Sequence, residues 1–352
     1  MENSDLRFDF VKMNCCGNDF VIIDCLDQSL FTENAVAEPG RSSLLYKSST
    51  LKSRTHNTSD SISLHTEEVR KICNRKTGIG CDQLIILLPN PSDIRQRHMH
   101  VWNNDGSKAR FCGNGARCAA AYISKKIKSI GKSSSTDTPP SFQKNSLKKE
   151  QTIKEEANIV SIVSGTIQVE CKILDPWIVD VRQPFPMVRH AITKEGIIKP
   201  CESIELENGA LAIPVFALNQ HAVVMNKRPE NRPISEQRLE EIAQSLQCHQ
   251  MFPEGTNVSI TSFDSKNCLA MTEVWERGVG ATSACGSAAC AVGASIFDIY
   301  KISSQVNIVM PGGQIQVNRS THNGAIFIHH SSRAEFVFQG EFVLNYYKYD
   351  SK

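Results

Sequence analysis

The sequence predicts a protein of the mixed α/β (α+β) class, built from two related halves. Three observations predict this class: short runs of β-branched residues, one segment with the periodicity of a helix, and a tryptophan-to-cysteine block that occurs twice. The 352 residues suit about two domains of roughly 150 residues each. Apolar residues make up 40% and charged residues 22%, as in soluble globular proteins.

The predicted strands are short apolar runs rich in valine and isoleucine. They are FVIID at 20–24, QLIILL at 83–88, IVSIV at 159–163 and VNIVM at 306–310. A helix is predicted after Ser235, a residue type that caps helix N-termini. The apolar side chains that follow it have the i, i+3, i+4, i+7 spacing of one helix face. They are Leu239, Ile242, Ala243 and Leu246.

Two polar stretches interrupt the apolar pattern. The first, at about 32–65, is rich in Ser, Thr and Lys, and the second, at about 131–158, contains a Pro-Pro pair and many Lys and Glu. Neither sustains an apolar period, so we expect both to be solvated surface insertions. The alternative for the second stretch is a basic recognition arm.

The charge balance argues against large polyanionic partners. The 39 Lys and Arg against 37 Asp and Glu leave a formal net charge of +2, too small for the footprint of a nucleic-acid or acidic-lipid binder. The expected partner is a small molecule, with no nucleic acid and no membrane. The first ten residues lack the apolar core of a secretion signal, and no apolar run approaches the roughly 20 residues of a membrane span. We therefore expect a cytoplasmic protein.

The 13 cysteines are expected to be reduced thiols, because the cytoplasm does not favour disulfides and an odd number fits a disulfide framework poorly. A metal site is not expected, since no CxxC pair occurs and the closely spaced histidines are isolated. Most of these cysteines then serve as small buried hydrophobic residues. The informative ones are those whose surroundings would favour a thiolate.

A comparison of the sequence with itself reveals an internal repeat. Trp102 precedes Cys112 by ten residues, and Trp275 precedes Cys285 by the same distance. Each cysteine is followed by glycine and then by small residues that a helix accepts, CGNGARCAAAYI in the first copy and CGSAACAVGASI in the second. The repeat predicts that each half holds a strand, a loop, a cysteine and a helix that begins at that cysteine.

A second matching block follows in the same order. Gly165 opens GTIQV after the first cysteine, and Gly313 opens GQIQV after the second. The distance from cysteine to glycine is 53 residues in the first copy and 28 in the second. The excess in the first copy is close to the length of the polar stretch at 131–158, which locates this insertion independently.

A cysteine at the first turn of a helix faces unpaired N–H groups and the positive end of the helix dipole, which favour a thiolate and also bind a carboxylate. If the halves pack face to face, the thiols of Cys112 and Cys285 converge on one cleft from opposite sides. One can remove a proton from a carbon while the other returns one to the opposite face. The helix N-termini stabilise the resulting carbanion through its carboxylate, so pyridoxal phosphate is not required. Two buried structural cysteines, or a redox pair, remain the alternative at this point.

Six blocks carry a family resemblance. They are KMNCCGNDFVIID at 12–24, GIGCDQ at 78–83, NNDGSKARFCGNGARCAA at 103–120, FPEGTNVSI at 252–260, WERGVGATSACGSAACA at 275–291 and MPGGQI at 310–315. Together they resemble the diaminopimelate epimerase family, the pyridoxal-independent two-cysteine enzymes of lysine and peptidoglycan precursor synthesis. The resemblance covers the chain from about Phe8 to the carboxyl-terminal region, apart from the two insertions.

The resemblance implies an architecture and an assembly. It implies two pseudo-symmetric domains, each a β-sheet wrapped around a central helix, with the active site in the cleft between them. We expect the first half at 1–175, the second half at 176–340, and a C-terminal strand at 341–352 that returns to the first half. The resemblance also implies a homodimer and no cofactor.

The resemblance assigns roles to individual residues. The paired catalytic cysteines fall on Cys112 and Cys285, the assisting histidine on His221 and the acidic partner of the second thiol on Glu276. The residues that would hold the distal end of the substrate are Asn103, Asn219, Asn257, Glu276 and Arg277. The backbone donors to the reacting carboxylate would be Gly113, Asn114, Gly286 and Ser287, with Asn18 and Gln83 lining the cleft.

The chain departs from the family pattern at several positions. Asn14-Cys15-Cys16 replaces the usual His-Gly-Leu and places two extra thiols near the predicted cleft. Leu218-Asn219-Gln220-His221 replaces Gly-Asn-Pro-His, so this loop loses a flexible residue and a rigid one. Ala281 stands where glutamate is common, and Ser287 stands where threonine is common, which keeps the hydroxyl.

The function implied by the resemblance is the interconversion of LL- and meso-2,6-diaminopimelate by two-base proton transfer at Cα. One rival is a related racemase of another amino acid, for example a histidine-type racemase. The retained distal-end residues argue against it, because a shorter substrate would leave these polar groups unpaired. The other rival is a catalytically silent binding or thiol-redox protein of the same fold.

Overall fold

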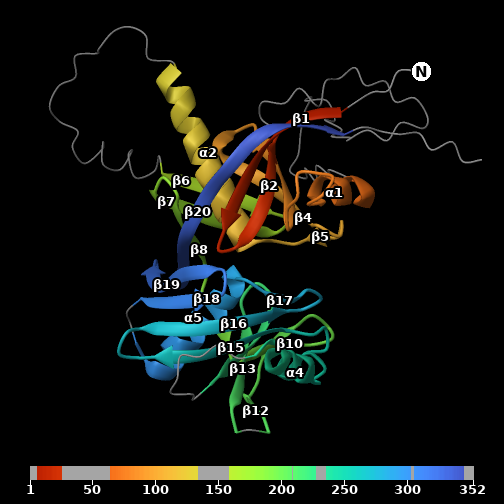
Figure 1. Ribbon diagram of the computed structural model, residues 1–352. Helices are drawn as coiled ribbons and strands as arrows, with labels where there is room; N and C mark the ends of the chain where they lie inside the picture. Colours follow the sequence, from red (N-terminus) through yellow and green to blue (C-terminus); the bar gives the residue numbers. More distant parts are fainter. Residues whose placement is uncertain are drawn as a thin grey trace, which may run out of the picture.

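The structure, a computed structural model, describes residues 6–25, 64–133, 158–207, 209–226, 235–302 and 305–344. These residues form two lobes, each a curved β-sheet around one long helix (Figure 1). The predicted mixed α/β class, with a sheet around a central helix in each half, is confirmed. Among the described helices, none combines the length and the apolar character needed to cross a membrane.

The first lobe is a ring of strands that closes on itself. Its elements are β1 (Leu6–Cys15), β2 (Asn18–Asp24), α1 (Thr66–Cys73), β3 (Gln83–Asn90), β4 (Asp93–Asn103), β5 (Lys108–Ala109), α2 (Gly113–Ser133), β6 (Ile159–Ser164), β7 (Ile167–Asp175), β8 (Ile178–Pro184) and the end of β20 (Ala325–Leu344). Pairing runs through β1, β2, β3, β4, β6, β7, β8 and β20, and β20 then pairs with β1. Helix α2 lies inside this ring, where it contacts most of its strands.

The strand sequences explain why two helices cover opposite faces of one sheet. In β2, Phe20 and Ile22 belong to the apolar cluster around α2, whereas Val21 and Ile23 belong to the cluster that includes α1. The residues of β3 alternate in the same way. QLIILL is therefore continuously apolar because both faces of this strand are buried.

The second lobe repeats this plan. Its elements are β9 (Met187–Val188), β10 (His190–Ile192), β11 (Ile198–Pro200), β12 (Ile204–Glu205), β13 (Leu211–Phe216), β14 (Gln220–Met225), α4 (Glu236–Gln247), β15 (Asn257–Asp264), β16 (Leu269–Glu276), β17 (Gly280–Thr282), α5 (Gly286–Tyr300), β18 (Val306–Met310) and β19 (Gly313–His322). Its ring runs through β13, β14, β15, β16, β18, β19 and β20, then through β8 into β9, which pairs with β13. Every residue of α5 from Ala288 to Phe297 is buried, as expected for a helix enclosed on all sides.

The predicted helix after Ser235 is also confirmed. Helix α4 begins at Glu236, and the Ser235 side chain accepts a hydrogen bond from the backbone N–H of Arg238. The four apolar side chains that predicted its buried face are all buried, namely Leu239, Ile242, Ala243 and Leu246. They pack against the outer face of the second sheet.

The internal repeat corresponds to the same three elements in each lobe. In the first lobe, Trp102 of β4 pairs with Lys108 of β5, and α2 begins after Cys112. In the second lobe, Trp275 of β16 pairs with Ala281 of β17, and α5 begins after the next cysteine. The predicted order of strand, loop, cysteine and helix is therefore confirmed in both halves.

Strand β20 belongs to both lobes. Its residues 325–331 pair with β19 of the second lobe, and its residues 334–344 pair with β1 of the first (Figure 1, blue). The return to the first lobe thus begins before the expected position 341, and residues 345–352 lie outside the described chain. Strand β8 pairs with β7, so the first sheet continues past the expected boundary at 175. Because β8 and β20 each pair with strands of the first ring and also lie in the second, no single residue separates the two sheets.

The two polar stretches lie largely outside the described chain, at residues 26–63 and 134–157. Helix α2 continues to Ser133, so it runs a short way into the second stretch, which we expected to begin at 131.

The lobes touch through backbone as well as side chains. The turn between β1 and β2 is formed by Cys16 and Gly17, both with positive φ, and it packs on the second lobe. A Cβ added to Gly312 would lie 2.0 Å from the carbonyl oxygen of Cys16. No side chain fits at this position, which explains the glycine pair of the MPGGQI block.

A charge network supports the start of β2. Lys12 donates to Asp19 at 2.6 Å, and Arg75 binds both carboxylate oxygens of Asp19 at 2.7 and 2.8 Å. Burial alone would raise the pKa of Asp19, but the hydrogen bonds from Arg75 and Lys12 outweigh burial and lower it. This carboxylate also accepts from the backbone N–H of Asp82, which directly precedes the first residue of β3.

We expect Asp19→Asn to destabilise the protein by about 2–3 kcal/mol at pH 7, because the largely buried Lys12 loses its counter-ion. The lowered pKa means that the carboxylate stabilises the fold above the unfolded pKa of about 3.9, and that this contribution is lost as the pH falls further. Urea unfolding of both proteins at pH 7 and pH 3 measures the difference. A difference that grows toward acid pH would contradict this account.

Candidate active site

The two repeat cysteines occupy equivalent helix N-termini. The first intrahelical hydrogen bonds run from Ala116 N–H to the Cys112 carbonyl at 2.9 Å and from Ala289 N–H to the Cys285 carbonyl at 3.0 Å. The Gly115 N–H also donates to the sulfur of Cys112 at 3.4 Å. Each cysteine therefore stands where backbone donors have no partner within the helix.

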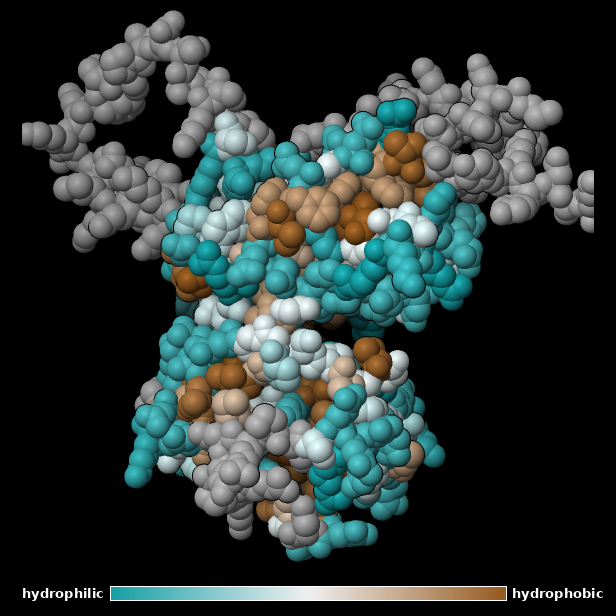
Figure 2. Space-filling view, viewed as in Figure 1, coloured by the Kyte–Doolittle hydropathy of each residue, from teal (hydrophilic) through white to brown (hydrophobic). Residues whose placement is uncertain are grey.

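The two helix starts meet at the junction between the lobes. A Cβ added to Gly113 would lie 3.7 Å from the Cα of Gly286. The charges of Cys112 and Glu276 both act on the thiol of Cys285. The structure thus brings together the two cysteines and the acid that the family resemblance singles out. The molecular surface narrows to a waist between the two lobes (Figure 2).

Burial opposes the thiolates that the helix dipole favours. Burial raises the pKa of Cys112 to about 12, and Glu276 adds to this shift while the Gly115 N–H opposes it. The pKa of Cys285 lies well above its usual value, first through burial and then through the charge of Glu276. Desolvation of the sulfur thus acts against the helix dipole, which favours the thiolate, and the raised pKa of both cysteines favours the thiol.

Glu276 is the acid whose charge acts on the second cysteine, Cys285. It ends strand β16, and its Oε1 accepts a hydrogen bond from the Thr282 hydroxyl at 2.8 Å. Burial raises the pKa of Glu276, while hydrogen bonds with Thr282 and Cys285 hold it down. The charge of this carboxylate in turn acts on the Cys285 thiol.

His221 reaches Cys285 through a serine. Its Nε2 lies 2.6 Å from Oδ1 of Asn219 and 3.1 Å from the hydroxyl of Ser287, which lies 3.4 Å from the sulfur of Cys285. Because the amide oxygen of Asn219 only accepts, Nε2 carries the proton. Burial lowers the pKa of His221 from 6.5 to about 3, so the ring is neutral. The serine was expected to contribute its backbone N–H, and the bridging role of its hydroxyl was not foreseen.

Amide side chains gather at the ends of three strands in the first lobe. Gln83 at the start of β3 donates to Oδ1 of Asn103 at the end of β4, at 2.9 Å. Asn18 begins the neighbouring strand β2. The buried oxygens Oδ1 of Asn18 and Oε1 of Gln83 have no hydrogen-bond partner in the described chain. Since unpaired buried acceptors are costly, these oxygens suit a polar ligand.

Asn257 and Arg277 lie together in the second lobe. Oδ1 of Asn257 accepts from the backbone N–H of Arg277 at 2.9 Å. The guanidinium of Arg277 is exposed and donates to the carbonyl of Glu254. The Asn257 amide therefore positions the backbone of Arg277, while the guanidinium of Arg277 remains accessible from solvent.

The departures in the LNQH loop have structural explanations. Leu218 has φ +65°, in the left-handed region that favours glycine, which costs of order 1 kcal/mol. The buried Gln220 side chain accepts from the backbone N–H of Ile192 at 3.0 Å and donates to the carbonyl of His190 at 3.3 Å. The glutamine ties β14 to β10, a role that proline could not fill. Ala281 is exposed, and nothing in the structure explains its departure.

The two extra cysteines lie at the junction between the lobes. The sulfur of Cys15 is 3.9 Å from Oδ1 of Asn114, and the sulfur of Cys16 is 2.9 Å from the hydroxyl of Ser332 on β20. A hydrogen bond with Cys118 is the main cause that raises the pKa of Cys15 to about 12. These thiols are packed and protonated.

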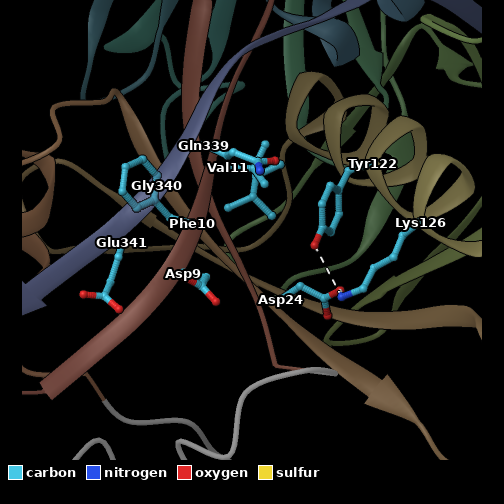
Figure 3. Close-up of a pocket in the computed structure, with 10 residues that line it drawn as sticks. Asp9, Phe10, Val11, Asp24, Tyr122, Lys126, Gln339, Gly340 and Glu341 are labelled. Atoms are coloured by element: carbon cyan, nitrogen blue, oxygen red, sulfur yellow. Dashed lines mark hydrogen bonds and ion pairs between the residues drawn. The ribbon is translucent and has the colours of Figure 1, made fainter. Parts of the chain in front are cut away.

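A cavity of about 450 Å³ lies elsewhere in the first lobe, between β1, β20 and α2 (Figure 3). Its polar wall includes Tyr122, Lys126 and Asp24, with the lysine ammonium 2.8 Å from the carboxylate. None of the residues that line this cavity belongs to the predicted site. We assign it no role in the chemistry.

Both the sequence and the fold of this chain are similar to those of known proteins. The sequence pattern of the family described as "Diaminopimelate epimerase" matches residues 56–181 and 217–335. The diaminopimelate epimerase of Blochmanniella pennsylvanica is 28% identical over 336 residues, which covers 94% of this chain and 98% of that protein. The diaminopimelate epimerase of Carboxydothermus hydrogenoformans is 28% identical over 337 residues, 96% of this chain and 100% of that protein.

Solved structures share the fold at lower identity. A hydroxyproline epimerase from Agrobacterium vitis, with bound trans-4-hydroxy-L-proline, has a TM-score of 0.54 and 14% identity, covering 96% of this chain and 93% of that one. A Bacillus anthracis protein of the PhzF family has a TM-score of 0.54 and 11% identity, covering 96% of this chain and 100% of that one. These likenesses concern the fold, whereas the sequence match spans both lobes and both cysteine blocks. The chain belongs to the diaminopimelate epimerase family.

Proposed function

We propose that the protein interconverts LL- and meso-2,6-diaminopimelate by cofactor-independent proton transfer between Cys112, Cys285 and the substrate Cα. The observation that carries this proposal is the meeting of two cysteine-bearing helix N-termini in a member of this family. The proposed role in the cell is lysine and peptidoglycan precursor synthesis in the cytoplasm.

The helix N-termini supply the seat for the reacting carboxylate. The backbone N–H groups that would donate to it are those of Gly113, Asn114, Gly286 and Ser287. As the Cα–H bond breaks, its electron pair delocalises into this carboxylate, and fixed donors stabilise the new charge without reorganising. Both helix dipoles also favour negative charge at this position.

The proton transfer needs one thiolate and one thiol. We assign the first removal of a proton to Glu276, because its carboxylate lies close enough to Cys285 for its charge to act on that thiol. The thiolate of Cys285 then takes the Cα proton, and the thiol of Cys112 gives its proton to the opposite face. In the reverse direction the two sulfurs exchange roles. Neutral His221 contacts the Ser287 hydroxyl, which in turn positions the sulfur of Cys285.

The distal end of diaminopimelate carries a second ammonium and a second carboxylate. The proposed partners for the carboxylate are the Arg277 fork and the Asn219 amide. The amide oxygens of Asn18, Gln83 and Asn103, with Asn257 beside the arginine, suit the ammonium because they accept hydrogen bonds. A substrate with a single amino-acid head would leave these groups unpaired, which favours diaminopimelate over a shorter amino acid.

We also propose that the protein is a homodimer. Three neighbouring apolar side chains of β20 are exposed on the first lobe: Phe336, Val337 and Phe338. The ring of Phe336 lies 6.4 Å from that of Trp177, and the ring of Phe338 lies 5.7 Å from that of the buried Phe10. A second copy of the chain would cover the exposed side chains.

We expect the wild-type protein in deuterium oxide to incorporate deuterium at Cα of diaminopimelate. Cys112→Ala and Cys285→Ala should each lower the rate of epimerisation at least about 100-fold, because each removes one partner of the proton transfer. Cys248→Ala, at an exposed position after α4, is the matched control and should keep the rate. Mass spectrometry and chiral chromatography measure both outcomes. Absence of exchange in the reduced wild-type protein would rule out the mechanism.

We expect Ser287→Ala to lower kcat about tenfold with little change in KM, because the hydrogen-bond chain from His221 to the Cys285 sulfur is broken. Ser287→Thr keeps the hydroxyl and should retain most of the activity. Steady-state kinetics of both variants measure the effect. Equal kcat for the alanine variant and the wild type would show that the serine hydroxyl has no part in the reaction.

We expect Arg277→Gln to raise KM for diaminopimelate about 10- to 100-fold, the range for a lost hydrogen bond to a charged group. Arg238→Gln on exposed α4 is the control and should leave KM unchanged. Turnover on histidine, proline and other amino acids with one stereocentre tests the substrate class. Faster turnover of any of these than of diaminopimelate would overturn the assignment.

A further inference from the structure

A buried arginine lies beneath the two helix N-termini. Arg117, one turn into α2, has an exposed fraction of 0%. Its Nη1 donates to Oδ1 of Asn114 at 2.7 Å, and its Nη2 donates to the carbonyl of His330 at 3.3 Å and to Nδ1 of the same histidine. No carboxylate forms an ion pair with it in the part of the chain that the structure describes. A buried cation without a counter-ion destabilises a fold, so its position calls for a functional explanation.

His330 is packed against both helix starts. A Cβ added to Gly113 would lie 3.3 Å from Cε1 of His330, and one added to Gly286 would lie 3.5 Å from the same atom. Burial, and then the charge of Arg117, lower the pKa of His330 well below 6.5, so the ring is neutral. Because a guanidinium only donates, Nδ1 is the acceptor and Nε2 carries the proton. The arginine thus fixes both the tautomer and the orientation of this ring.

Asn114 extends the same network into the second lobe. Its Nδ2 donates to the carbonyl of Ala284 at 3.4 Å, and Ala284 directly precedes Cys285. Its side-chain oxygen is held by Arg117, and its backbone lies in the first turn of α2 beside Cys112. The guanidinium of Arg117 is therefore connected to each helix start in two ways, through Asn114 and through His330.

We propose that Arg117 is a positioning residue, which holds the N-termini of α2 and α5 at the separation that places the two catalytic sulfurs on opposite faces of one Cα. It does not touch the substrate. The planar fork makes two divergent sets of hydrogen bonds at fixed angles, which a lysine ammonium on a flexible stem does not reproduce. This inference rests on the proposed function, because it concerns the geometry of the same two thiols.

Inversion and exchange depend differently on this geometry. A single thiolate suffices for exchange with retention, because the thiol that it becomes on taking the Cα proton exchanges that proton with deuterium oxide and returns a deuteron to the same face. Inversion requires the second sulfur to be in place on the other face at the same time. A shift of one helix start therefore suppresses inversion more than it suppresses deuterium exchange with retention of configuration. A loss of folded protein lowers both rates by the same factor.

The experiment measures both rates on diaminopimelate in deuterium oxide, with the intact full-length chain. For Arg117→Lys we expect the ratio of inversion to exchange with retention to fall at least tenfold. Arg97→Lys is the matched control, because Arg97 is equally buried in the same lobe but donates to the carbonyls of Ile94 and Gln96 and lies 3.8 Å from the Asp24 carboxylate, none of which belongs to a helix start. Its ratio should equal that of the wild type, even if its stability is lower.

A second pair of variants covers the case in which Arg117→Lys does not fold. His330→Gln keeps an acceptor for the guanidinium and should keep the ratio, whereas His330→Leu removes the acceptor and should lower it. Parallel loss of both rates in Arg117→Lys or His330→Leu, or an unchanged ratio in either, would overturn the positioning role. Failure of the proposed function looks different, because the wild-type protein itself would then neither exchange nor invert diaminopimelate.

Discussion

Two helices point their positive ends at each other in the interior of this protein, and the rest of the structure depends on keeping them there. Like-signed helix ends repel, and the nearby Arg117 adds a full positive charge to the same region. The two enclosing sheets supply the opposing force, because α5 is buried on all sides and α2 contacts most strands of its ring. The two helix ends lie close together, since a Cβ added to Gly113 or Gly286 would be 3.7 or 3.6 Å from the Cα of the other glycine.

Burial has two opposite effects on the chemistry of this junction. It raises the pKa of both cysteines, which disfavours the thiolate needed to remove a proton. It also strengthens every hydrogen bond to a charge that develops there, because little water competes. The charge of Glu276 adds to the raised pKa of Cys285, so in the proposed mechanism the thiolate of Cys285 forms only when this carboxylate accepts the proton.

The sequence was sufficient for features that repeat or follow a local period, as the two cysteine blocks and α4 show. The family resemblance added His221, Glu276 and the amide residues, and of these the structure links His221 to Cys285 through Ser287 and brings the charge of Glu276 to bear on the same thiol. Three features had no local signal. Arg117 and His330, which contact each other, are 213 positions apart in the sequence. The Ser287 hydroxyl contacts His221, 66 positions away. Strand β20 pairs with strands of both lobes. Contacts between distant segments are set by the closing of the rings, which no short window of sequence contains.

The position of β20 has a consequence for how the protein is made. Leu6 pairs with Leu344, so the first strand of the chain is hydrogen-bonded to the last one described. During synthesis, the amino-terminal lobe emerges from the ribosome without the strand that joins β8 to β1 and closes its ring. Its open strand edges stay available for wrong partners until β20 has been made. The two lobes therefore resemble each other in form, but the ring of the first closes only after most of the second has been synthesised, which makes its closing a long-range step.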